Sequence, residues 1–209
     1  MIDYRDLTSQ LTRIEDKLAR LRRSDRRLKL FGASAHGYRL NPKLRDGTIA
    51  EFEGKHRIHL PHDYRCFIRF LGNGGVGPYY GLGTLEDGIF ADMDSRKKNY
   101  LLDLSSPFPY SEPWNIDISI FENTPEENIS ELEERYFDTS HAAGLLRLCN
   151  YGCGVSINLV VKGAEYGIMW TDDRVNNLGI FPSYELGNKD KLVFIDWYEL
   201  WLDNSLATF

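Results

Sequence analysis

The chain has 209 residues, of which 42% are hydrophobic and 13% aromatic, and a formal net charge of −6. This length and composition suit one domain whose core is large enough to fold without disulfides or metals. There is no run of 18 apolar residues and the first ten residues are polar, so the sequence predicts neither membrane insertion nor export. Three cysteines, an odd number, are typical of a reducing compartment, and we therefore expect a cytoplasmic protein.

Charge is divided unevenly along the chain. Residues 1–60 carry 14 basic and 8 acidic side chains, whereas the remainder carries 11 basic and 23 acidic. Overall acidity argues against DNA as the main partner, because phosphate binding depends on many positive contacts. An acidic surface instead favours fast encounter with a basic protein, and we expect no direct nucleic-acid partner.

Helical spacing of leucine and isoleucine predicts a first helix from about residue 3 to residue 31, which ends at Gly32. Its basic stretch RLRRSDRRLK, residues 20–29, could contact nucleic acid, but it continues the nonpolar face of the helix and is better interpreted as a solvated face. A loop is expected to follow. The sequence TIAE then predicts a second helix, opened by a reciprocal cap between Thr48 and Glu51.

A glycine-rich run, FLGNGGVGPYYGLG, occupies residues 70–83. A phosphate loop places its glycines between a strand and a helix and closes with a Lys, whereas these glycines follow a predicted helix over 61–71 and no Lys lies among them. The run therefore predicts a left-handed helix stop and then a turn, at Gly72, Asn73, Gly74 and Gly75. Alternating aromatic residues after it predict a strand over 79–88.

The second half of the chain alternates between irregular and regular patterns. We expect irregular structure in the Pro-rich residues 105–114 and one acidic helix over 122–137. Short connectors between three apolar runs predict an antiparallel meander, with strands over 144–150, 154–161 and 164–170. A final helix over 191–206 carries aromatic residues at helical spacing, for packing on the sheet. No repeat or linker occurs, which favours a single domain over 1–209.

No catalytic, cofactor-binding or metal-binding set is predicted. Cys149 and Cys153 lack a second Cys or His pair to complete four zinc ligands, and buried small hydrophobes are the other interpretation. Glycan hydrolysis would need two positioned carboxylates, for which the candidates are Asp172 and Asp173 together with Asp92 and Asp94. With 31 acidic residues such pairs arise by chance, and loop residues that cap turns are the alternative. The five histidines lie outside any nucleophile motif: His36, His56, His59, His62 and His141.

Several motifs in order resemble the SUKH superfamily, which includes regulators of cell-wall and glucan synthesis. LPHDYRCFIRFLGNGGVGPYYGLG is similar to the family's helix, NGG turn and following strand. SSPFPYSEPWN, the GC-containing sheet segment with its closing Trp, and FIDWYELWLDNSL are similar to later family segments. The resemblance covers about residues 40–206, and residues 1–32 form an N-terminal helical extension. The motif positions are Asn73, Gly74, Gly75, Gly77, Pro78, Gly152, Gly154, Trp170, Trp197 and Trp201.

The resemblance implies an α+β fold, in which N-terminal helices and a Trp-rich C-terminal helix pack on a mainly antiparallel, twisted sheet. It also implies a binding role in place of catalysis. Bacterial members of the family are immunity proteins that neutralise toxins by direct binding in the cytoplasm, and eukaryotic members are linked to wall synthesis. We therefore expect a protein partner, a cognate and basic toxin, with a regulatory scaffold for glucan synthesis or a carbohydrate-active enzyme as alternatives.

Residue chemistry suggests where such a partner would bind. Interfaces favour Tyr, Trp and Arg at the centre and acidic rims toward a basic partner. The candidates are Tyr79, Tyr80, Asp172, Asp173 and Arg174, with an acidic patch of Glu126, Glu127, Glu131, Glu133 and Glu134. Core aromatics, a charged turn and a solvated helix face are the competing interpretations of these three groups.

Overall fold

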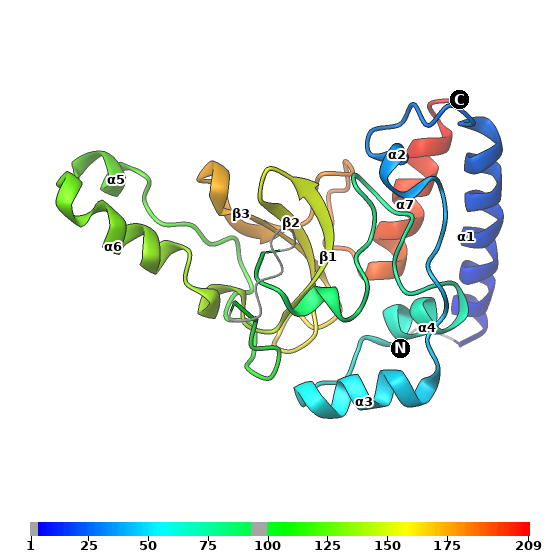
Figure 1. Ribbon diagram of the computed structural model, residues 1–209, viewed down its shortest axis with the longest axis horizontal. Helices are drawn as coiled ribbons and strands as arrows, with labels where there is room; N and C mark the ends of the chain where they lie inside the picture. The colour runs from blue at the N-terminus through cyan, green and yellow to red at the C-terminus, as the bar shows by residue number, and fades with distance from the viewer. Residues whose placement is uncertain (1–3, 93–99) are drawn as a thin grey trace.

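A four-stranded antiparallel sheet lies at the centre of the computed structural model, which describes residues 4–92 and 100–209 (Figure 1). Its strands follow the chain in the order β1-β2-β3-β4. They are β1 Leu145–Gly152, β2 Val155–Val160, β3 Met169–Asp173 and β4 Gly179–Pro182. Together with seven α-helices in the described ranges, this sheet confirms the predicted α+β class.

The meander differs from the predicted strands at its second connection. Residues 164–167 form a turn, in which the Gly167 amide donates to the Val160 carbonyl at 2.8 Å, so the third strand begins at Met169 and not at Ala164. Gly167 has a φ of +88°, a conformation that glycine adopts without strain. Strand β4 was not among the three predicted strands, because its four residues are too short to show a period.

Helix α7, Phe194–Leu206, packs on the sheet and carries several of the large buried aromatic side chains of the core. Trp197 and Tyr198 are fully buried. Helix α4, His62–Phe70, meets α7 through Phe67, whose ring lies 5.1 Å from that of Phe194 and 4.8 Å from that of Tyr198 in edge-to-face geometry. The predicted aromatic stripe of the C-terminal helix is therefore confirmed as a packing surface.

The N-terminal helix α1, Tyr4–Ser24, packs on the outer side of α7, which lies between α1 and the sheet (Figure 1). Ile14 and Leu21 of α1 are fully buried. Polar side chains tie the two helices together at the edge of this contact, because Lys17 reaches Glu199 at 2.9 Å and Asp203 at 2.6 Å. The basic helix therefore belongs to the folded body of the protein.

Helix α1 is shorter than predicted and ends at Ser24 instead of Phe31. The side chain of Asp25 is the physical reason, because it accepts hydrogen bonds from the backbone amides of Lys29 at 2.8 Å and Leu30 at 3.0 Å and from the Tyr38 hydroxyl at 2.8 Å. These local bonds compete with continuation of the helix. Part of the predicted loop instead forms a short helix, α2 Ala33–His36.

Helix α3, Asp46–His56, begins two residues before the predicted cap at Thr48. The residue at its N-cap is Arg45, and no side chain caps this end, so the predicted Thr48–Glu51 capping arrangement is wrong. The helix packs on the core through Ile49 and Phe52, which are buried.

The glycine-rich run begins where helix α4 ends. Helix α4 ends without a left-handed residue, because the amides of Leu71 and Gly72 both donate to the Phe67 carbonyl and Gly72 has no positive φ. The predicted left-handed stop at Gly72 is therefore wrong, whereas Gly74 and Gly75 do adopt positive φ values of 78° and 99°. The Gly75 amide donates to Leu82 and is occupied within the protein, so it is not available to a phosphate.

The predicted strand over 79–88 is reduced to single bridges along the free edge of β1. Leu82 pairs with Gly75 on one side and with Cys149 on the other, and the Gly83 amide donates to the Leu148 carbonyl at 2.7 Å. Positive φ values at Tyr79 and Gly81 turn the chain and interrupt a regular strand. A short 3₁₀ helix, η1 Asp87–Ile89, occupies the end of the predicted strand.

Close backbone approach leaves no room for a side chain at Gly75 of this run. A Cβ atom there would lie 2.4 Å from the Arg39 carbonyl oxygen. We expect Gly75→Ala to lower the free energy of unfolding by about 2–4 kcal/mol in urea denaturation. The matched control is Gly54→Ala, where no atom lies within 4 Å and helix propensity should raise stability by about 0.5–1 kcal/mol. Equal effects of the two changes would contradict this role for Gly75.

A buried carboxylate in α4 caps the N-terminus of α7. The Asp63 side chain is 3% exposed and accepts the Ile195 amide at 3.0 Å. Burial raises the pKa of Asp63, so the acceptor oxygen matters more than the charge. We expect Asp63→Ala to cost about 1–2 kcal/mol, the loss typical of a helix cap, and Asp63→Asn to stay within about 0.5 kcal/mol of the parent. Thermal unfolding of both variants tests this, and an Asn variant as unstable as the Ala variant would refute it.

Helices α5, Ser119–Asn123, and α6, Glu126–Tyr136, project from the sheet on the side opposite α1 (Figure 1). They replace the one helix predicted over 122–137, because Pro125 interrupts the chain between them. Tyr136 holds the base of α6, since its buried hydroxyl donates to Asn115 at 2.7 Å. We call α5 and α6 the projecting arm. Within the described ranges, no helix is long and nonpolar enough to cross a bilayer.

Candidate functional site

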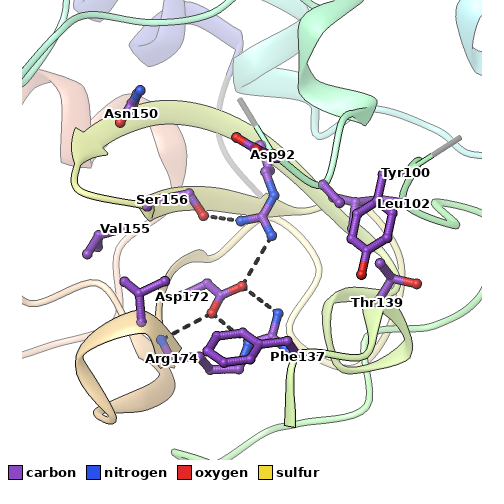
Figure 2. A pocket seen from close by; sticks show the side chains of 14 residues that line it. Asp92, Tyr100, Leu102, Phe137, Thr139, Asn150, Val155, Ser156, Asp172 and Arg174 are labelled. Atoms are coloured by element: carbon purple, nitrogen blue, oxygen red, sulfur yellow. Dashed lines mark hydrogen bonds and ion pairs between the residues drawn. The ribbon is translucent and has the colours of Figure 1, made fainter. Parts of the chain in front are cut away.

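A cavity of about 330 Å³ opens next to the sheet, where β1, β2 and β3 meet the base of the projecting arm (Figure 2). Its nonpolar lining includes Leu102, Phe137 and Val155. Its polar lining includes Asn150, Ser156, Thr139 and Asp92. The volume lies at the lower end of the range for sites that bind small molecules.

Three buried charged residues form the floor of this cavity, and we call them the Arg–Asp–Arg triad: Arg147, Asp172 and Arg174. Arg174 clamps Asp172 in a bidentate pair, in which Nε donates to Oδ1 and Nη2 to Oδ2, both at 2.8 Å. Arg147 Nη2 donates to the same Oδ2 at 3.2 Å. One carboxylate therefore serves two guanidinium groups, and the triad has an excess of one positive charge.

Sheet register explains how the triad is assembled. Side chains alternate between the two faces of a strand, and paired residues on neighbouring strands share a face. Arg147 of β1 is paired with Asn158 of β2, and Ser156 of β2 with Asp172 of β3. These four side chains lie on one face of the sheet, and Arg174 reaches them from the 3₁₀ helix η3, Arg174–Asn176, directly after β3.

The two arginines differ in how fully their donors are used. Arg174 completes its bonds through Nη1, which donates to the carbonyls of Tyr136 at 2.8 Å and Asp138 at 3.2 Å. Arg147 Nη1 bonds Ser156 and Asn158, but its buried Nε has no partner among the described residues. Burial lowers the pKa of Arg147 below its ordinary value, and the charges of Asp172 and Asp92 offset this lowering only in part. Arg147 is thus the less satisfied cation of the triad.

Asp172 is held in its ionised form. Burial alone would raise the pKa of Asp172, but hydrogen bonds from Arg174 and the charges of both arginines outweigh burial and lower this pKa below its usual value. A carboxylate with these bonds to two guanidinium groups is a structural anion and not a free general base or nucleophile. Of the other carboxylates considered for glycan hydrolysis, Asp173 accepts a hydrogen bond from the Asn176 side chain at 2.7 Å, and Asp94 lies outside the described residues.

Two of the residues predicted to contact a partner are buried. Asp172 and Arg174 are 5% and 4% exposed, and Asp172 and Asp173 belong to β3 and not to a loop after the strand. A partner would reach Asp172 and Arg174 only through the cavity. Sequence reasoning missed Arg147 entirely, although the polar residues at alternate positions 156 and 158 of an apolar strand are a signal for a polar patch on one sheet face.

Tyr79 and Tyr80 belong to a group of neighbouring aromatic side chains that we call the aromatic patch: Phe31, Tyr79, Tyr80 and Tyr151. Tyr80 is 48% exposed and lies 5.3 Å from the ring of Phe31, which is itself 65% exposed. Tyr79 is half-buried against Tyr151 at 4.0 Å. The competing interpretation as core aromatics is therefore wrong for Tyr80. Phe31 and Tyr151 were not predicted members, because they are distant in sequence.

The five glutamates predicted as an acidic patch are all exposed on α6: Glu126, Glu127, Glu131, Glu133 and Glu134. Their helix stands away from the body of the protein on the projecting arm (Figure 1). This arrangement leaves the carboxylates accessible to a second molecule. It is equally the arrangement of a solvated helix face, and their binding role stays a prediction.

The motif glycines and tryptophans have structural roles. Trp170, Trp197 and Trp201 are buried, at 0%, 0% and 9% exposure, as predicted. Gly152, the last residue of β1, and Gly154, in the turn before β2, both take positive φ values. The Asn73 side chain accepts a hydrogen bond from the Leu85 amide at 2.8 Å and so fixes the chain after Gly77 and Pro78. The carbonyl of Pro78 accepts a hydrogen bond from the Cys149 thiol.

Nucleophile and metal candidates are weak. Cys66 lies 3.6 Å from His62 on the same helix, but burial raises the pKa of the Cys66 thiol, which disfavours the reactive thiolate. Cys149 is buried and Cys153 is exposed. In the part of the chain that the structure describes, no group of three or more His, Cys, Asp or Glu side chains is placed to hold a metal.

Comparisons with protein-family models, with curated proteins and with solved structures gave no match to this chain. Function must therefore be inferred from the residues and from their geometry.

Proposed function

We propose that the chain is a non-catalytic protein-binding domain of the SUKH type that acts in the cytoplasm as an immunity protein and neutralises a basic toxin by direct binding. One observation carries this proposal. The projecting arm presents five exposed glutamates on a helix that is held at its base by Tyr136.

Electrostatics support this choice of partner. A cluster of carboxylates in high-dielectric surroundings contributes little to the stability of its own fold. The same cluster steers a positively charged partner and speeds encounter, and it resembles the charge of the nucleic acid that a basic nuclease would bind. Aromatic side chains supply the nonpolar contacts of interfaces, and the aromatic patch offers a second exposed surface of that kind.

The triad supports binding over hydrolysis. The one buried carboxylate of the cavity is bonded to two arginines, so it cannot act with a second carboxylate as the acid and base of a glycosidase. A protein that works by binding is expected to show no turnover of glycans, and an Asp172→Asn variant is expected to leave that result unchanged.

Growth protection tests the proposal. The chain is co-expressed with the toxin encoded next to its gene, and we expect growth to be restored and a stable complex to be recovered. The control is the toxin with an empty vector. Survival no better than with the empty vector would remove the immunity function, and recovery of wall-synthesis proteins in place of a toxin would favour the scaffold alternative.

A further inference from the structure

We propose that the C-terminal end of helix α1 docks on the projecting arm of a second copy of this chain, so that copies associate head to tail. The docking surface is built on six exposed cationic residues at and just after the end of α1, which we call the basic end: Arg20, Arg22, Arg23, Arg26, Arg27 and Lys29. The proposal goes beyond toxin binding, because it concerns the protein alone and needs no toxin.

Carboxylates near the basic end balance only part of its charge. Asp25 is buried and bonded to two backbone amides and to the Tyr38 hydroxyl, and it offsets one of the six cations. On the neighbouring helix α7, the Asp203 carboxylate is already paired with Lys17 at 2.6 Å. The carboxylate of the last residue, Phe209, lies at the same side of the molecule and offsets one more cation (Figure 1). Six cations less these two carboxylates leave four positive charges.

Helix dipoles do not remove this excess. Helices α1 and α7 both end at this side of the molecule, and each C-terminus carries roughly half an elementary negative charge (Figure 1). About three positive charges therefore remain at the basic end. None of its five arginines has an ion-pair partner among the residues that the structure describes, so their guanidinium groups are accessible to a second molecule.

The projecting arm carries the opposite charge in nearly equal amount. Five exposed glutamates and the exposed Arg135 give α6 an excess of four negative charges, of which its N-terminal dipole offsets roughly half of one. Within residues 4–92 and 100–209, these glutamates have no ion-pair partner. The arm lies on the side opposite α1, so its carboxylates and the basic end of the same molecule cannot meet (Figure 1). They can meet only between copies.

The aromatic patch adjoins the basic end and adds nonpolar surface to it. Gly32 packs so closely on the backbone of Tyr79 that a Cβ atom on Gly32 would lie 1.6 Å from the Tyr79 carbonyl oxygen. Phe31, two residues after Lys29, lies against Tyr80, and these two rings are 65% and 48% exposed. Arginine and exposed aromatic side chains together are typical of protein interfaces.

The arm offers nonpolar side chains that such a surface would bury. Ile120 of α5 and Phe137, directly after α6, are 44% and 37% exposed. Opposite charges would guide the two ends together, and burial of these side chains against the aromatic patch would add the nonpolar part of the contact. Exposed ion pairs with few nonpolar anchors give weak contacts, so we expect a reversible association.

The contact joins two different surfaces of the same chain. Each pair of copies therefore keeps one free basic end and one free arm, and further copies can add unless the geometry closes a ring. We expect the average mass to rise with protein concentration beyond that of a dimer. It should return to that of the monomer as added salt screens the charges.

Sedimentation velocity of the full chain, without toxin, tests the proposal. Two triple variants remove charge from the basic end and from the arm, respectively: Arg23→Gln, Arg26→Gln and Arg27→Gln, and Glu127→Gln, Glu131→Gln and Glu134→Gln. Each variant should weaken self-association at low salt about tenfold or more, because each loses three exposed ion pairs. A mixture of the two should form a one-to-one complex and nothing larger, because each variant supplies the one surface that the other lacks.

A matched control removes the same charge at the side of the molecule where α1 begins, on α3 and just before it: Lys43→Gln, Arg45→Gln and Lys55→Gln (Figure 1). This control should associate like the parent. A single-stranded oligothymidylate is titrated in parallel, because cations beside aromatic rings also suit single-stranded nucleic acid.

Four results would overturn the proposal: a parent that stays monomeric at low salt, a variant mixture that forms no complex, a control as impaired as the end variant, or oligothymidylate binding at the basic end that is tighter than self-association. Because toxin neutralisation is measured separately, either proposal can fail without the other.

Discussion

Asp172→Ala is expected to lower the free energy of unfolding by about 3–5 kcal/mol, because removal of one partner of a buried ion pair leaves uncompensated charge in the core. Here the change leaves two guanidinium groups, those of Arg147 and Arg174, without their shared carboxylate. The measurement is urea denaturation at neutral pH, with the slope of the transition checked for two-state behaviour. Asp173→Ala is the matched control, because the neighbouring carboxylate is partly exposed and should cost less than about 1 kcal/mol.

The dependence of stability on pH gives an independent test of the triad. The pKa of Asp172 is lower in the folded chain than its ordinary value, so its contribution is complete above that ordinary value and is lost as the pH falls through the folded pKa. The parent should therefore lose stability below about pH 4 more steeply than Asp172→Asn, which has no proton to bind at this site. Identical acid slopes for the two proteins would show that the triad does not hold Asp172 ionised.

Reversal of charge on the projecting arm should have the largest effect on function. Glu127, Glu131 and Glu134 are exposed and spaced to share one face of α6. We expect their simultaneous change to Lys to slow association with a basic toxin about 10- to 100-fold at low salt, because electrostatic steering becomes repulsion. Stopped-flow association at several salt concentrations measures this, and the difference between parent and variant should shrink as salt rises.

The control for this triple variant carries the same change in net charge at distant exposed positions on α1 and α3: Glu15, Asp16 and Glu51. If steering depends on the projecting arm, the control should bind nearly as fast as the parent. A control as slow as the arm variant would mean that overall acidity, and not the arm, guides the partner.

Elements with a strong period were predictable from the sequence, and elements fixed by side-chain competition were not. The aromatic stripe of α7 and the alternating strands β1 and β2 were recognised because their nonpolar residues repeat at helical or strand spacing. The end of α1 was misplaced because a single Asp25 side chain bonds two later amides and stops the helix, although the nonpolar period continues to Leu28.

The candidate site was only partly predictable for a related reason. Exposure of the five glutamates follows from their place opposite the nonpolar face of one helix, and local spacing is enough to see it. The triad joins residues 147, 172 and 174 through sheet register, and the aromatic patch joins Phe31 to Tyr151. Such contacts depend on which strands pair and where turns place them, and no local pattern encodes them. Asp172 was therefore taken as a loop residue when it is the buried centre of an ion network.

The most direct test of the proposed binding function is a calorimetric titration of the purified chain with the purified product of the toxin gene expected beside its own. We predict a saturable complex, formed in the absence of any turnover, whose affinity falls as salt is added and falls further when the glutamates of α6 are changed to Lys. The absence of any complex at low salt, or a complex whose affinity is indifferent to those glutamates, would contradict binding through the projecting arm.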